Sequence, residues 1–416
     1  MHKRDFIRTL GGATLGLMLG DELWARAAAT PPHRLAQDER FWREIRSRYL
    51  LTPEYINLEN GFYSMQSQPV LEAFIGRVRE VNRQAARYMR TRQSEDKAAA
   101  RNRLAAMAGV PPEEMIVTRN TTEALDTVIS GFPWQAGDEA LMAEQDFPAM
   151  LNQFRLMARR YGMVNRMVSL PVDPASDEEL VRLYESAITP RTRMLMLCHV
   201  INTSGQILPV ARIAAMAHRH GVQVLVDGAH AFALLEFAIP DLGCDYYGAS
   251  LHKWLGCPLG AGILWLRREH IPAIWPLFAS FGHRDDDIRK LNHTGTHPVH
   301  TDLAINDAMD FHERIGTRRK EARLRHLQRY WTDQVRGRPG ITLNTPSDPA
   351  RSCAVANVAV AGLTPAELAR TLFERFRIYT GAVDAAGIRG ARVTPHVFTT
   401  TAELDSLVRA LLTLAG

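Results

Sequence analysis

Short apolar runs alternate with stretches of helical periodicity between Lys97 and Arg268. A strand that is buried on both faces forms a continuous apolar run, whereas an amphipathic helix repeats its apolar residues every three or four positions. Seven runs have the strand pattern, namely Glu114–Val117, Glu139–Ala143, Met163–Val168, Met194–His199, Val222–Val226, Asp245–Gly248 and Ala261–Leu266. Helical periodicity separates them at Thr122–Ser130, Ala149–Arg160, Asp177–Ser186 and Ala211–His220. This alternation predicts an α/β fold in which helices cover a mainly parallel sheet.

Two residues at the ends of these runs stand out. Asp227 ends the run Val222–Val226 and is followed by Gly228, as expected where a parallel strand ends at a ligand site. Lys253 is one of only five lysines and lies among Leu251, His252, Trp254 and Leu255. An ammonium on such an apolar turn is costly unless it is paired or deprotonated, and a lysine that loses its proton can form a Schiff base. The alternative is a lysine whose head extends from the turn into water.

The pair suits the chemistry of pyridoxal phosphate (PLP). Lys253 follows Asp227 by 26 positions, with a further strand-like run between them. A lysine holds the PLP aldehyde as an imine, and a carboxylate keeps the pyridine nitrogen protonated so that the ring withdraws electrons.

Six segments, in the same order, make the chain similar to the class V aminotransferases of PLP fold type I, in their isopenicillin-N-epimerase-like branch. The segments are Thr118–Ala124, Cys198–Pro209, Val226–His230, Gly248–Gly256, Gly295–Thr296 and Ala391–His396. The resemblance implies a large domain with a mainly parallel seven-stranded sheet and a smaller C-terminal α+β domain. It implies PLP as the cofactor, bound through Lys253 and Asp227.

The resemblance also assigns the other cofactor contacts. Backbone N–H groups and hydroxyls at a helix N-terminus bind phosphate well, although the same residues also suit an ordinary helix cap. Phe147 would stack on the pyridine ring, an apolar core role being the alternative, and Asn202 and His230 would lie beside the ring hydroxyl oxygen. Thr296 belongs to a loop that reaches the phosphate of the neighbouring subunit, which implies a homodimer with shared active sites. The phosphate ligands implied are Asn120, Thr121, Thr122, Ser250 and His252.

Substrate contacts are expected at both ends of the chain. Arg392 matches the arginine that binds the substrate α-carboxylate, a task for which its planar fork is suited. Asn60 and Tyr63 lie in a turn near the implied substrate entrance, with an ordinary packed loop as the alternative.

The first thirty residues have the pattern of an export signal. A basic start at His2–Arg8 precedes a mildly apolar run and small residues at Ala25 and Ala27–Ala29 that a peptidase could cleave. The spacing is similar to a twin-arginine signal, except that Lys3 stands where the first arginine belongs. We therefore expect a periplasmic or otherwise exported protein with no stable membrane insertion of the mature chain. A disordered or helical arm on a cytoplasmic protein is the alternative.

The remaining chain divides by pattern into three parts. Residues 31–60 would pack on the small domain, residues 61–300 would form the large PLP-binding domain, and residues 301–416 the small domain. We expect one long connecting helix from about Asp302 to Val335.

Composition narrows the functional classes. The net charge is +5 and the arginines are scattered, so nucleic-acid binding is not supported. The four cysteines are far apart and form no C-x-x-C pair, so neither a metal site nor a disulfide framework is expected.

These features predict an exported PLP enzyme that acts at the α-carbon of an amino acid or similar amine. An aminotransferase is the first choice, and an epimerase, a C–S lyase or a catalytically inert PLP-fold binding protein is the alternative. Cysteine desulfuration is disfavoured, because the loop Tyr379–Arg389 lacks the cysteine that similar desulfurases carry there.

Overall fold

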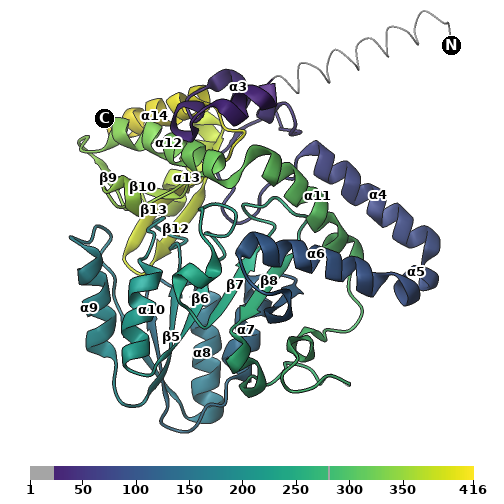
Figure 1. The fold of residues 1–416 in the computed structure, drawn as a ribbon. Coiled ribbons are helices and arrows are strands. Elements are labelled where there is room, and N and C mark those ends of the chain that lie inside the picture. The colour runs from purple at the N-terminus through teal and green to yellow at the C-terminus, as the bar shows by residue number, and fades with distance from the viewer. Residues whose placement is uncertain (1–22, 280–281) are drawn as a thin grey trace, which may run out of the picture.

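The computed structural model describes residues 23–279 and 282–416 (Figure 1). A large domain lies below a smaller domain in this view, and the chain passes twice between them. The basic start of the predicted leader and its whole apolar run lie outside the described residues. None of the helices in the described ranges has the length and apolarity that a membrane span requires.

The large domain is built on one seven-stranded sheet. Its strands are β2 (Met115–Thr118), β3 (Glu139–Ala143), β4 (Val164–Val168), β5 (Thr192–Cys198), β6 (Gln223–Asp227), β7 (Tyr246–Ser250) and β8 (Gly262–Leu266). They lie in the order β2-β8-β7-β6-β5-β3-β4, and only β8 runs antiparallel to its neighbours. Each predicted strand is present within about two residues of its expected bounds, as is the mainly parallel arrangement.

Helices cover both faces of this sheet, as the continuous apolar strands require. One face packs against α7 (Thr121–Gly131) and α8 (Pro148–Tyr161), and Met196 of β5 points into that layer. The neighbouring residues Leu195 and Leu197 point into the other layer, which α6 (Gln93–Ala108), α9 (Asp177–Ala187) and α10 (Val210–Arg219) cover. Alternate side chains of one strand therefore enter two separate cores.

The small domain contains a four-stranded antiparallel sheet. Its strands are β9 (Ile341–Leu343), β10 (Ala356–Val360), β12 (Gly381–Ala385) and β13 (Ile388–Val393), in the order β12-β13-β10-β9. Helices α13 (Pro365–Phe376) and α14 (Thr401–Ala415) pack with it. The segment Tyr379–Arg389, predicted as a loop, mainly forms the hairpin of β12 and β13, and β12 is largely half-buried or exposed.

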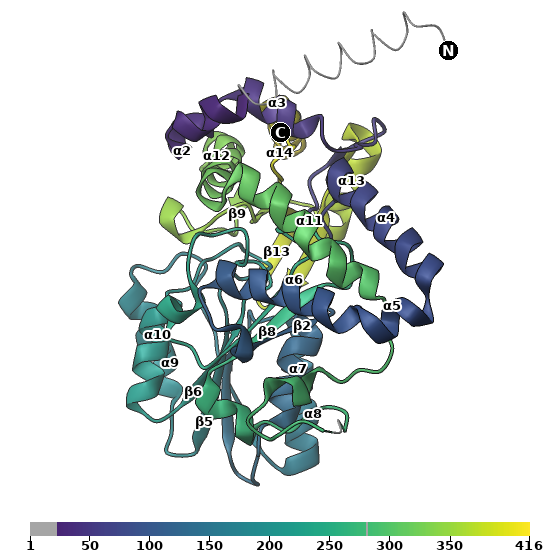
Figure 2. The same cartoon turned by 45° about the vertical axis from the view of Figure 1, so that its right-hand side comes forward.

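The predicted long connecting helix is two helices. α11 (Val299–Ile315) and α12 (Thr317–Val335) are separated by Gly316, whose φ of 86° and ψ of 136° are not helical. A positive φ is easily adopted only by glycine, and the continuous apolar periodicity of the segment hid this break. α4 (Gln68–Gln84) and α5 (Ala86–Thr91) were not predicted either, and α4 and α6 pack against α11 (Figure 2).

The N-terminal segment packs on the small domain. Arg46 of α3 (Glu39–Arg46) forms a two-pronged ion pair with Glu403 at 2.9 and 3.0 Å. The fully buried Arg323 of α12 donates to the Ala36 carbonyl, next to the short helix α2 (Pro32–Leu35). Strand β1 (Ile56–Asn57) pairs in parallel with β11 (Ile378–Tyr379).

Residues 23–29 are also helical and pack on this segment. Ala27 is 1% exposed, and the ring of Trp24 meets Phe41 edge-on at 5.6 Å. Cleavage among the small residues up to Ala29, as predicted from the sequence, would therefore remove part of the packed structure.

Candidate active site

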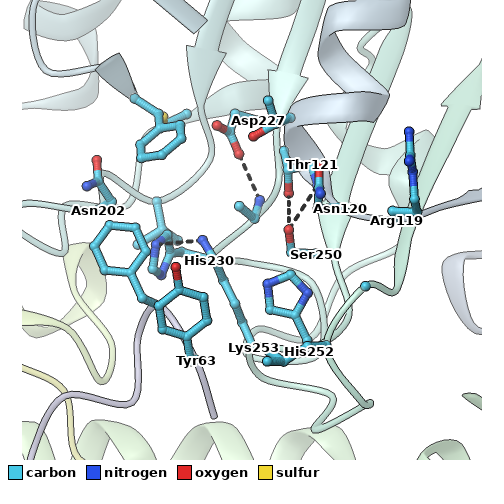
Figure 3. Close-up of a pocket in the computed structure, with 18 residues that line it drawn as sticks. Tyr63, Arg119, Asn120, Thr121, Asn202, Asp227, His230, Ser250, His252 and Lys253 are labelled. Atoms are coloured by element: carbon cyan, nitrogen blue, oxygen red, sulfur yellow. Dashed lines mark hydrogen bonds between the residues drawn. The ribbon is translucent and has the colours of Figure 1, made fainter. Parts of the chain in front are cut away.

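An open cavity of about 320 Å³ lies at the carboxyl ends of β5, β6 and β7 (Figure 3). Its size falls within the lower part of the range of small-molecule sites, ~300–1,000 Å³. Ligands of open α/β sheets bind at this edge, because the loops that follow parallel strands meet there. Eleven predicted site residues line the cavity: Tyr63, Asn120, Thr121, Thr122, Phe147, Asn202, Asp227, His230, Ser250, His252 and Lys253.

Lys253 lies in the turn after β7 and is 8% exposed. Its Nζ is 3.2 Å from Nε2 of His230 and 5.6 Å from the ring centre of Phe62. Burial lowers the pKa of the Lys253 amine to about 8, and the charge of Asp227 opposes the shift. A substantial fraction of the amine is therefore unprotonated at mildly alkaline pH, as a Schiff-base lysine requires.

Asp227 occupies the last position of β6, deep in the cavity. Its Oδ1 accepts a hydrogen bond of 2.9 Å from the Ala229 N–H. Burial raises the pKa of the carboxyl group, and the nearby Lys253 amine opposes that rise. A buried carboxylate in this position can hold a protonated ring nitrogen, which would supply the positive partner that the carboxylate needs.

The N-terminus of α7 forms one side of the cavity (Figure 3). Ser250 Oγ accepts a hydrogen bond of 2.9 Å from the Thr121 N–H and lies 2.7 Å from Thr121 Oγ1. Asn120 caps the helix, because its Oδ1 accepts from the Glu123 N–H at 2.8 Å. The helix start packs closely on β8, since a Cβ on Gly262 would lie 2.8 Å from the Asn120 Cα. The cap and the cavity wall are thus the same residues, and this helix end favours an anion.

Three buried polar atoms of the cavity wall have no hydrogen-bond partner among the described residues. They are Asn202 Oδ1, His230 Nδ1 and His252 Nδ1. Burial is the main cause that lowers the pKa of His252 to about 4 and that of His230 well below its usual range, so both rings are neutral near pH 7. Because these three atoms line the cavity, a polar ligand bound there could supply their missing partners.

PLP fits this arrangement. Its aldehyde requires an unprotonated amine, its ring nitrogen a carboxylate, its hydroxyl oxygen a polar neighbour and its phosphate a helix N-terminus. Lys253, Asp227, Asn202 or His230, and the start of α7 with Ser250 supply these four needs. Phe147 lines the cavity as the aromatic wall and packs with the tilted ring of Phe62 at 6.3 Å.

Three predicted residues lie outside the wall of this cavity. Asn60 is fully buried, and its Nδ2 donates to the Thr394 carbonyl at 2.9 Å, so it joins β1 to the small domain. Thr296 is exposed on the segment before α11. Arg392 is 1% exposed, and its guanidinium fork is filled by the carboxylate of Glu59. The sequence did not predict that a carboxylate of the same chain would pair with this arginine.

Several residues of the cavity wall were not predicted. Phe62 and Arg119 directly precede the predicted residues Tyr63 and Asn120, so their position in the sequence could have indicated them. The other four residues without a prediction, apart from Cys198 with its thiol, are apolar or small and have no reactive group: Val200, Ala229, Leu259 and Gly260.

Metal ligands do not cluster in the residues that the structure describes. All four cysteines are buried and unpaired. Only Cys198 reaches the cavity, and burial raises the pKa of its thiol well above the usual value.

Comparison with known proteins agrees with the geometry. The family described as aminotransferase class-V matches residues 57–415. The chain is 30% identical to the isopenicillin N epimerase of Streptomyces clavuligerus over 392 residues, which cover 90% of this chain and 98% of that protein. It is 31% identical to the isopenicillin N epimerase of Amycolatopsis lactamdurans over 400 residues, with the same coverage.

Solved structures show the same fold. The apo cysteine desulfurase of Thermococcus onnurineus NA1 has a TM-score of 0.80 at 21% identity, covering 89% of this chain and 97% of that one. A variant of C-DES with glycine covalently linked to its PLP cofactor also has a TM-score of 0.80, at 22% identity, with 89% and 99% covered. The predicted fold class, PLP fold type I, is thereby confirmed.

The match over nearly the whole described chain, together with a cavity that suits the cofactor, establishes that this protein belongs to the class V aminotransferase family of PLP-dependent enzymes.

Proposed function

We propose that the protein transfers protons at the carbon that bears a substrate amine, and that its reaction is a transamination. The observation that carries the proposal is the buried Lys253, whose amine is available near neutral pH beside Asp227. When bound, PLP withdraws electrons from the amine-bearing carbon and makes its proton acidic.

The residues of the chain then have distinct tasks. Lys253, once the substrate amine has replaced it, takes the proton from the carbon and delivers it elsewhere on the same side. Burial is the main cause that lowers the pKa of this amine to about 8. At that pKa the amine can both accept and return a proton near pH 7 to 8. Asp227 holds the nitrogen of the PLP ring, and Phe147 limits the access of water to one face of that ring.

Transamination is preferred because one base suffices for it. A 1,3-proton shift removes and returns the proton on one face, which a single lysine can reach. Of the other titratable groups on the cavity wall, His230 and His252 are buried and their pKa values are lowered, so they are weak bases.

Epimerisation is the second candidate, because two relatives aligned over 98% of their length are named isopenicillin N epimerase. It starts with the same proton removal and differs in the face to which the proton returns. The exposed Tyr63, at the cavity mouth and stacked on His252 at 6.4 Å, is the group that we would test as the second proton donor.

Cysteine desulfuration is not supported by the cysteine positions. A persulfide nucleophile must be exposed to substrate as a thiolate. The only cysteine at the cavity is Cys198, whose burial and whose neighbours Asp227 and Asp146 oppose ionisation.

The test is incubation of the cofactor-loaded protein with a panel of amino acids and other amines in D₂O, with and without a keto acid acceptor. Transamination predicts deuterium at the α-carbon and transfer of the amino group to the acceptor, both detected by mass spectrometry. Inversion without an acceptor would favour the epimerase, and no exchange with any amine would favour an inert binding protein. Lys253→Ala should abolish the deuterium exchange. Lys290 lies outside the cavity wall, so Lys290→Ala should retain the exchange.

We also propose a homodimer with shared sites and export of the protein. The exposed position of Thr296, outside the cavity of its own chain, supports a role in a neighbouring subunit.

The packing of Ala27 supports a leader that ends before residue 23 rather than at residue 30. Molar mass from light scattering and the N-terminal sequence of the protein from each cell fraction test these two points.

A further inference from the structure

Each nitrogen of the Arg392 guanidinium donates a hydrogen bond to a group of its own chain. Its Nε donates to Glu59 Oε2 at 3.2 Å, its Nη2 donates to Glu59 Oε1, and its Nη1 donates to the Asn202 carbonyl at 3.1 Å. The two bonds to Glu59 form the two-pronged arrangement that arginine otherwise makes with a ligand carboxylate. The side chains of Arg392 and Glu59 are only 2% and 10% exposed.

The structure provides a specific place for the Glu59 carboxylate. A Cβ on Gly381 would lie 2.5 Å from Glu59 Oε2, so a larger residue at this position would displace the carboxylate from its place. Gly381 is the register partner of Arg392 in the small sheet. The Glu59 backbone is held as well, by a bridge to Thr394 and by its N–H, which donates to Asn57 Oδ1 at 3.0 Å. The ion pair is therefore held from several sides.

Phe62 connects this pair with the cavity. The guanidinium carbon of Arg392 lies 4.2 Å from the ring centre of Phe62, and Lys253 Nζ lies 5.6 Å from the same centre. Phe62 belongs to the cavity wall, whereas Arg392 does not. A substrate amine at Lys253 would thus be one aromatic ring away from an arginine that already holds a carboxylate.

We propose that Glu59 is a specificity-determining residue that competes with the substrate for Arg392. A substrate with a carboxylate on its amine-bearing carbon must exchange places with Glu59, whereas an amine without a carboxylate has no such exchange to make. Glu59 therefore reduces the preference of the site for α-amino acids over simple amines. This inference rests on the proposed function for the identity of the substrate and deepens it.

The test compares two ligands of similar size, L-alanine and ethylamine, which differ by the carboxylate. The absorbance of the cofactor-loaded protein during titration gives a dissociation constant for each. We expect Glu59→Gln, which leaves Arg392 without its anion, to increase the preference for L-alanine over ethylamine at least tenfold. Arg392→Met combined with Glu59→Gln should abolish this gain.

A second variant addresses the same contact without changing Glu59. Gly381→Ala places a methyl group against the Glu59 carboxylate, so it should loosen the pair and move the preference in the same direction. An unchanged or reduced preference for L-alanine in a folded Glu59→Gln or Gly381→Ala protein would overturn the inference.

Propionate has no amine, so its binding to the cofactor-loaded protein, measured by calorimetry, separates this inference from the proposed function. Tighter binding of propionate to Glu59→Gln than to the wild type is expected whether or not any amine reacts. If no variant responds to any amine but propionate binds more tightly, the proposed function fails and the competition stands. Equal propionate binding by both proteins would refute the competition.

Discussion

Lys320 offers a direct test of the electrostatics around the active-site turn. It lies on α12, is 4% exposed, and donates a hydrogen bond to the carbonyl of Trp254, the residue after Lys253. Burial lowers the pKa of the Lys320 amine from 10.5 to about 7, and the nearby Cys257 and Cys353 oppose the shift. His312 and His396 also face it, and the pKa of each is well below its usual value because both rings are buried.

The sign and size of the effect follow from proton linkage. Between pH 7 and 10.5 the unfolded chain binds a proton that the folded chain has released, so stability rises with pH through this window. One pKa unit corresponds to ~1.4 kcal/mol, so the full contribution is on the order of 5 kcal/mol. About 2 kcal/mol of it should develop between pH 7 and pH 9.

Replacing Lys320 with Met removes this dependence. Relative to the wild type, Lys320→Met should lose about 2 kcal/mol of stability as the pH rises from 7 to 9, because the variant has no amine to deprotonate. Urea denaturation of the cofactor-saturated proteins at a series of pH values measures the difference, in which the other titrating groups cancel. Lys320→Arg is the control: its charge cannot be released, so it should be destabilised at every pH. A constant difference between the wild type and Lys320→Met would refute the reasoning.

Four further predictions concern the cofactor site and the backbone. Asp227→Asn should weaken PLP binding at least tenfold, measured by absorbance titration, because a neutral amide cannot balance a protonated ring nitrogen. Ser250→Ala removes the hydroxyl that accepts from the Thr121 N–H and that is expected to contact the phosphate at the start of α7. It should increase the PLP dissociation constant severalfold, while circular dichroism shows that the chain remains folded. Gly316→Ala should destabilise the protein by ~1–3 kcal/mol in urea, because its φ of 86° disfavours a side chain. Gly76→Ala, in the helix α4 with open space around it, should instead stabilise by ~0.5–1 kcal/mol.

The large sheet was predictable because its determinants are local. All strands but the half-exposed β4 are mainly buried apolar runs, and the central polar cavity residues lie at the end of such runs, as Asp227 does in β6 and Ser250 in β7. Strand order and the antiparallel direction of β8 depend on contacts between distant segments, and periodicity does not contain them. The division of the long helix at Gly316 was missed because one glycine barely changes an apolar pattern.

The partner of Arg392 was missed for a different reason. The motif around Arg392 indicates an arginine that can hold a carboxylate, but it does not indicate which carboxylate. Glu59 is 333 positions away and lies two residues after the short strand β1, where the sequence pattern is unremarkable. Only the folded chain, with β1 paired to β11 and Gly381 leaving space, brings the two side chains together.

The segment from Ile56 to Ser64 connects Arg392, where we propose that Glu59 competes with the substrate, to the cavity. β1 ties it to the small domain, Glu59 holds Arg392, and Phe62 forms the cavity wall. The Ser64 N–H then donates to the His252 carbonyl at 3.3 Å, next to Lys253. Because the groups that hold PLP lie mainly on the sheet and α7, substitutions in this segment should alter which amines are accepted more than the affinity for PLP. If Glu59 competes with the substrate as we propose, exchanges within this short segment can change the choice of substrate in this protein while the residues of the cofactor site remain constant.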